Sequence, residues 1–109
     1  MREFLKRKIV CSLLVLLLMA PTAGWAHLPL VLCVDNGDNS ITCQGGFSDG
    51  STAAGVAMQI KAVDGRVLLE GRLDDASEFT FMKPGDDFVV VFDAGPEHQL
   101  QVPGQRIAQ

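Results

Sequence analysis

The sequence predicts an all-β protein, a small antiparallel β-sandwich of about seven strands with an immunoglobulin-like or transthyretin-like outline, preceded by a cleavable signal peptide. Three observations predict this class. Short apolar or alternating segments recur at regular spacing along residues 28–102, turn signals separate them, and none of them has a helical period. We therefore divide the chain into a signal peptide (1–26), a sandwich domain (27–102) and a short tail (103–109).

The first part of the chain has the features of an export signal. Residues 2–8 carry four basic side chains, residues 9–20 are an almost unbroken apolar run, and Gly24 and Ala26 are small residues at the two positions that a signal peptidase reads. The apolar run is shorter than the roughly 20 residues that a membrane span needs. We expect cleavage after Ala26, which makes His27 the mature N-terminus of an exported, periplasmic or extracellular protein that does not insert into the membrane.

Seven segments carry a strand pattern. In chain order they are residues 28–34, 40–47, 56–63, 67–73, 79–82, 88–92 and 98–102. Asp64-Gly65, between the third and the fourth segment, is the strongest hairpin signal. Residues 88–92 are nearly all apolar, which is typical of a central strand covered on both faces. We expect the tail 103–109 to be disordered.

Two cysteines remain after the signal, and they flank a stretch rich in turn residues. A tight hairpin at residues 35–39 places Cys33 and Cys43 opposite each other across two paired strands. In an oxidising compartment this arrangement favours a structural disulfide, whose short closed loop stabilises the fold by roughly 2–3 kcal/mol. The alternative is a thiolate metal site, for which two cysteines with no histidine between them offer few ligands.

Charge and motif content exclude several functions. From residue 27 onward the chain has five basic and twelve acidic residues, a formal charge of −7, and no cluster of Lys and Arg. Such a domain repels phosphate backbones and anionic headgroups, so nucleic acids and membrane surfaces are not expected partners. The sequence has no nucleophile elbow and no phosphate-binding loop, and Asp74-Asp75 and Asp86-Asp87 lie in turns that face water. We expect no enzyme activity.

Only two histidines exist, and both follow the signal. A terminal His27 offers an α-amine that titrates near ~7.7 and an imidazole that titrates near ~6.5, so both can be neutral ligands around neutral pH. Two nitrogens from one residue suit Cu(II) or Ni(II). His98 is the natural further donor, with Asp93 and Glu97 as nearby oxygens. The alternative is that His27 simply follows a cleavage site and that His98 is an ordinary surface residue.

Several short motifs together resemble one family. They are Ala26-His27 at the cleavage site, Gly46-Phe47-Ser48-Asp49-Gly50, Asp64-Gly65 leading to Leu69-Glu70-Gly71, Glu78-Phe79-Thr80-Phe81, and Asp93-Ala94-Gly95 followed by His98. The chain is similar to the small exported β-sandwich component of energy-coupling-factor transporters for nickel and cobalt, which itself resembles carboxypeptidase regulatory-like domains. The resemblance implies an extracytoplasmic accessory that binds or hands over nickel or cobalt, with the two family histidines at His27 and His98.

The chain departs from the family pattern at a few positions. Cys33 and Cys43 stand where ordinary apolar residues are expected, Ser77 stands where a turn glycine is usual, and Pro96-Glu97 replaces a more flexible pair. The resemblance also implies the subunits of a membrane transporter as partners. Because no membrane segment follows the domain, we expect docking through protein contacts.

Two hypotheses of different classes follow. The first is a metal-binding accessory that uses His27 and His98, assisted by Asp93 or Glu97, and that takes nickel or cobalt, with copper as a further candidate. The second is a non-catalytic carboxypeptidase-regulatory-like scaffold or adhesion module that binds another envelope protein through a sheet edge or a loop, because sandwiches of this kind host many unrelated roles.

Overall fold

The computed structural model describes residues 28–109, which form seven β-strands and one short 3₁₀-helix. The elements are β1 (Pro29–Asp35), β2 (Ser40–Phe47), β3 (Ala57–Ala62), β4 (Val67–Arg72), β5 (Glu78–Met82), β6 (Phe88–Asp93), β7 (Gln99–Pro103) and η1 (Gly104–Arg106). Each strand begins and ends within one residue of the position that the sequence predicts. The prediction of a small antiparallel sandwich of about seven strands is confirmed, whereas the signal peptide 1–26 lies outside the described residues.

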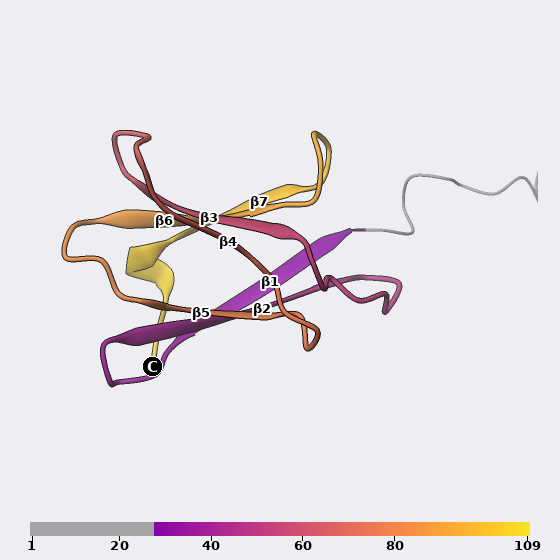
Figure 1. Ribbon diagram of the computed structural model, residues 1–109, viewed down its shortest axis with the longest axis horizontal. Helices are drawn as coiled ribbons and strands as arrows, with labels where there is room; N and C mark the ends of the chain where they lie inside the picture. Colours follow the sequence, from indigo (N-terminus) through magenta and orange to yellow (C-terminus); the bar gives the residue numbers. More distant parts are fainter. Residues whose placement is uncertain (1–27) are drawn as a thin grey trace, which may run out of the picture.

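The strands pair into two stacked antiparallel sheets (Figure 1). One sheet has the order β1-β2-β5 and the other the order β4-β3-β6-β7, so the chain changes sheet after β2, β4 and β5. Among residues 28–109, no helix is long and apolar enough to cross a membrane.

The connections between the strands gather at two ends of the sandwich (Figure 1). We call the end where the described chain begins the proximal end, and it carries the connections 48–56, 73–77 and 94–98. The distal end carries the connections 36–39, 63–66 and 83–87. Residues at opposite ends are therefore separated by the length of a strand.

The core lies between the sheets and is built by the alternation of each strand. The largest fully buried side chains are Ile41, Cys43, Met58, Ile60, Val90 and Phe92. They come from the central strands β2, β3 and β6, because only a central strand has neighbours on both sides. The prediction that residues 88–92 form a central strand is confirmed, because β6 lies between β3 and β7. On its outward face Val91 is only 6% exposed, whereas Val89 and Asp93 are partly exposed, so this face is covered only in part.

A disulfide joins Cys33 of β1 to Cys43 of β2. The two residues are direct partners in the antiparallel register, with their Cα atoms 4.0 Å apart. Both side chains belong to the core, being 7% and 0% exposed. The predicted structural disulfide is confirmed, and a thiolate metal site at these two residues is ruled out in this oxidised state.

The tail is the part of the fold for which the sequence-based expectation is wrong. Instead of being disordered, residues 104–106 form η1, and Ile107 packs against the core. The backbone N–H of Asp35 donates a hydrogen bond to the carbonyl of Ala108 over 3.0 Å, which ties the tail to β1. A single apolar residue among polar neighbours gives no periodic signal, so only the folded domain shows that Ile107 has a place to pack.

Removal of the disulfide should destabilise the domain. A Cys33→Ala/Cys43→Ala variant should lose about 2–3 kcal/mol of unfolding free energy, because its unfolded chain is no longer constrained by a closed loop. Urea denaturation with and without a reductant measures the loss. The variant should be insensitive to the reductant, and two reactive thiols in the native exported protein would contradict the expectation.

Gly45 and Gly46 form a matched pair on β2. A Cβ atom built on Gly45 would lie 2.7 Å from Leu73 Cδ1 and 2.8 Å from the buried ring of Phe92, whereas one built on Gly46 meets nothing within 4 Å. Gly45→Ala should therefore cost about 1–3 kcal/mol through overpacking, and Gly46→Ala should change the stability much less. Thermal or urea unfolding compares the stability of the two variants. Equal losses of stability would show that the side chains around Gly45 can move to make room for a methyl group.

Candidate functional site

His98 ends the tight turn between β6 and β7, at the proximal end. Its backbone N–H donates to the carbonyl of Gly95 over 2.9 Å, and its own carbonyl accepts from the N–H of Ala94 over 3.1 Å. Asp93 Oδ1 accepts from the N–H of Gly95 over 3.0 Å and from Gln99 Nε2 over 3.1 Å. Gly95 has a φ of 123°, a left-handed value that favours glycine. These bonds give the partly exposed His98 a defined position.

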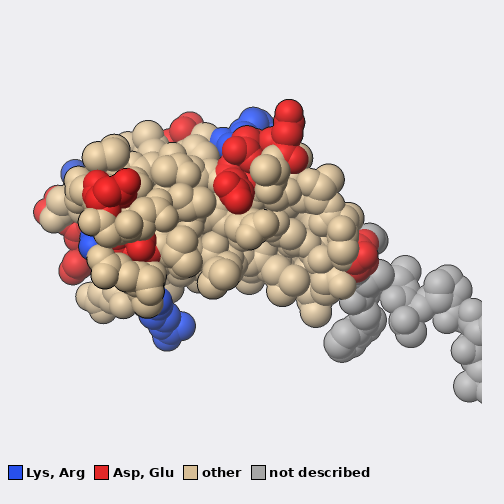
Figure 2. Space-filling view, turned by 90° about the horizontal axis from the view of Figure 1, so that it is seen from below, with Lys and Arg blue, Asp and Glu red and all other residues tan. Residues whose placement is uncertain are grey.

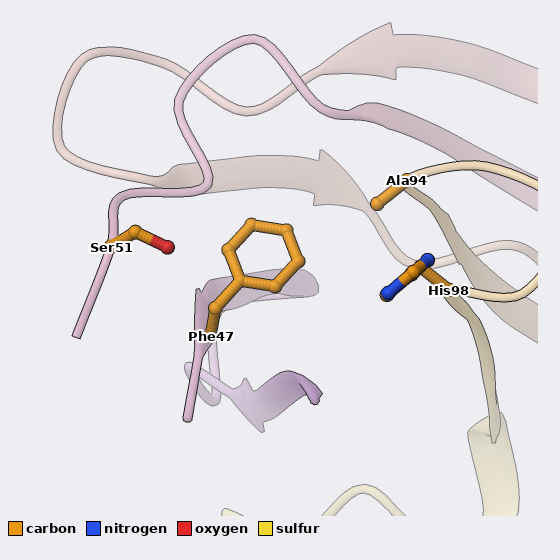
Figure 3. Close-up of a pocket in the computed structure, with 4 residues that line it drawn as sticks. All are labelled: Phe47, Ser51, Ala94 and His98. Carbon is orange, nitrogen blue, oxygen red and sulfur yellow. The ribbon is translucent and has the colours of Figure 1, made fainter. Parts of the chain in front are cut away.

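A small pocket opens beside this histidine. It has a volume of about 250 Å³ and is lined by Phe47, Ser51, Ala94 and His98. Figure 3 shows the Phe47 ring between Ser51 and His98, with the imidazole directed toward the ring. Phe47 itself packs edge-on against the buried Phe92, with ring centroids 6.0 Å apart. The pocket therefore combines an aromatic wall anchored in the core with one imidazole and one hydroxyl group.

Ser77 holds together two connections at the proximal end. Its φ of 60° places its backbone in the left-handed region, where glycine is the usual residue. Its hydroxyl accepts a hydrogen bond from the N–H of Ala53 over 3.1 Å and shares another with the Thr52 hydroxyl. The turn 73–77 is thereby tied to the connection 48–56, which carries Ser51 to the pocket.

The described chain begins next to the pocket. The N–H of Leu28 donates to Ser48 Oγ over 3.0 Å, and the N–H of Ser48 donates to the carbonyl of Leu28 over 2.9 Å. Pro29 is the register partner of Phe47, the central residue of the pocket lining. The predicted ligand His27 lies outside the described residues. It directly precedes Leu28 in the sequence, and Leu28 is the first described residue and lies at the proximal end.

The other two predicted ligands, Asp93 and Glu97, do not line the pocket beside His98. Asp93 is partly buried and its Oδ1 holds the turn, while Glu97 is exposed to solvent. Within residues 28–109, no three His, Cys, Asp or Glu side chains gather into a group that could hold a metal ion.

Sequence reasoning did not assign Phe47 and Ser51 to a site. Phe47 belongs to the motif Gly46-Phe47-Ser48-Asp49-Gly50, and Ser51 directly follows it. The available signal is an aromatic residue at the last position of a strand, directly before a polar connection. That signal does not say which turn from the other sheet will face the ring.

Three carboxyl groups at the distal end, away from His98, have lowered pKa values. Hydrogen bonds from the Gly37 N–H and from Lys83 lower the pKa of Asp35. The pKa of Asp38 is lowered mainly by the hydroxyl of the neighbouring Ser40, and that of Asp64 mainly by the N–H of Arg66. These carboxylates stabilise turns.

The fold and the pocket together define a class of protein, a small disulfide-bonded β-sandwich with a histidine beside an apolar pocket at the end where the described chain begins. No family model, no curated protein and no solved structure matches the chain. The assignment of function therefore depends on the residues themselves.

The lowered pKa of Asp35 predicts that the stability of the folded domain depends on pH. Because the folded value lies below the ordinary 3.8, ionised Asp35 contributes stability that is present above 3.8 and is lost as the pH falls through the lowered pKa. Lys83→Met removes the 3.0 Å bond from Nζ to Oδ2 and should raise the pKa of Asp35, while the Gly37 bond keeps it below 3.8. A carbon-detected NMR titration measures this, with Lys61→Met as the control. A measured pKa of wild-type Asp35 at or above 3.8 would contradict this prediction.

Proposed function

We propose that this protein is an extracytoplasmic accessory that binds a divalent transition metal, nickel or cobalt, through His98 and His27. The observation that carries the proposal is the position of His98. It lines a pocket with Phe47, and the register partner of Phe47 is Pro29, two residues after His27. The resemblance to the exported component of nickel and cobalt transporters points to the same two histidines.

The donor chemistry supports the proposal. Cleavage after Ala26 would free an amine and an imidazole on His27, two nitrogens that close a chelate ring on a tetragonal ion. His98 would supply the third nitrogen. Glu97 is the better placed carboxylate for a fourth position, because it is exposed while Asp93 Oδ1 already accepts two hydrogen bonds. Cu(II) would outcompete Ni(II) at such nitrogens, so selection for nickel or cobalt depends on metal supply and on the transporter.

The proposed setting is outside the cytoplasm. The Cys33–Cys43 disulfide supports an oxidising compartment, where such bonds form and persist. The partners would be subunits of a membrane transporter, reached through protein contacts, with metal transfer and no catalysed reaction. The formal charge of −7 from residue 27 onward favours cationic cargo and disfavours nucleic acid.

Calorimetric titration with Ni(II), Co(II) and Cu(II) tests the proposal on exported protein purified from cells that express the full chain. We expect binding tighter than millimolar, and a loss of roughly tenfold or more in affinity, about 1.4 kcal/mol, in both His27→Ala and His98→Ala. Asp86→Asn, which alters an exposed carboxylate at the distal end, is the control. Mass spectrometry of the mature N-terminus accompanies the titration.

One further variant separates the chelate from the imidazole alone. An insertion of Gly-Ser-Pro between Ala26 and His27 keeps both imidazoles but moves the free amine away from His27. The proline has no backbone N–H, so no chain of amine, amide and imidazole donors can form in place of the original chelate, and binding should weaken. No binding tighter than millimolar, or binding unchanged in both histidine variants, would contradict the proposal and favour the scaffold alternative.

A further inference from the structure

A row of large apolar side chains runs along the outward face of β1. Leu28, Leu30, Leu32 and Val34 are 53%, 54%, 68% and 40% exposed, and we call these four residues the β1 stripe. They alternate with residues that pack in the core, such as the disulfide-bonded Cys33. Edge strands of natural sheets usually carry charges that discourage association, whereas the outward positions of this edge strand are entirely apolar.

The face around the stripe is nearly free of charge. The register places Gly46, Gln44 and Thr42 of β2 beside the stripe, and Thr80 and Met82 of β5 beyond them. Glu78 is the one charged residue among the outward strand positions of this sheet. Figure 2 looks onto the molecule from this side and shows an uncharged surface in its lower middle part, bordered by acidic groups in the upper middle and at both ends.

We propose that two copies of this domain associate through the outward faces of their three-stranded sheets, with the β1 stripes antiparallel. Exposed apolar patches of this kind mark association sites. Two copies of an acidic domain repel each other wherever carboxylates meet, and this face avoids that repulsion. The stripe is also complementary to itself, because a two-fold axis brings Leu30 of one copy opposite Leu32 of the other.

The contact is made by faces and not by strand edges. The backbone N–H of Asp35 already donates to Ala108, so the tail covers one end of the free edge of β1. Sheets that pack face to face lie about 10 Å apart and interlock through side chains. Gly46 leaves open space beside Leu30, since a Cβ built on it meets nothing within 4 Å, and a leucine of the second copy can enter there.

The β1 stripe needs its neighbouring rows to make a stable contact. A stable interface removes about 800 Å² from each partner, which is more than the β1 stripe supplies alone. The uncharged rows of β2 and β5 extend it, including Met82, which is 66% exposed. The dimer therefore uses most of the outward face of this sheet.

Sedimentation equilibrium tests the proposal on the exported protein purified from cells that express the full chain. A metal chelator is present throughout, so that association bridged by a metal ion does not contribute and the outcome is independent of the proposed metal function. We expect dimers at micromolar concentration. The dissociation constant of the dimer should rise roughly tenfold or more in Leu32→Glu and should not change in Val63→Glu. The two variants are matched, because Leu32 and Val63 are 68% and 71% exposed and receive the same charge.

Leu32→Ser separates lost apolar contact from added charge and should also favour the monomer. Circular dichroism confirms that each variant keeps the fold. A wild-type protein that stays monomeric at high micromolar concentration, or a dimer that Leu32→Glu leaves intact, overturns the proposal. A monomer that floats with phosphatidylcholine vesicles, and loses this in Leu32→Glu, assigns the stripe to a lipid surface and also overturns it.

Discussion

The antiparallel pairing of β1 with β2, locked by the Cys33–Cys43 disulfide, is the constraint on which the rest of the structure depends. A slip of one residue in this register would turn Cys33 and Val31 outward and drive the leucines of β1 into the core. The covalent bond joins two residues that face each other directly, so it excludes that slip. This register also fixes the positions of the first described residues and of the 36–39 turn, which flank β1.

Each end of the sandwich depends on this pairing in its own way. At the proximal end, the register places the beginning of the described chain beside Phe47 and therefore beside the pocket that contains His98. At the distal end, it presents Asp35 to Lys83 and to the C-terminal tail, which covers one end of the free edge of β1. The proposed metal site therefore lies at the proximal end, whereas the bond between Asp35 and Lys83 lies at the distal end. The face between the ends is left for association.

The strands and the disulfide could be predicted because their signals are local. Alternation along Ser40–Phe47 and the Asp64-Gly65 turn specify strand and hairpin within a few residues. The tail and the pocket could not be predicted, because they depend on packing between distant segments. Ile107 finds its place against a core built mainly by β2, β3 and β6. Ser51 lies at the pocket on a connection that the next two residues, Thr52 and Ala53, tie to Ser77 by hydrogen bonds.

The sequence by itself determined an acidic all-β domain with seven strands, one disulfide pair and two histidines behind an expected export signal, because composition and short periodic patterns suffice for these features. Only the tertiary structure decided which turn faces which strand end. It placed His98 beside Phe47, left Asp93 occupied within its own turn, and turned the β1 stripe toward solvent. The physical reason is that burial is shared between sheets, and alternation along one strand does not say which of its faces a second sheet will cover.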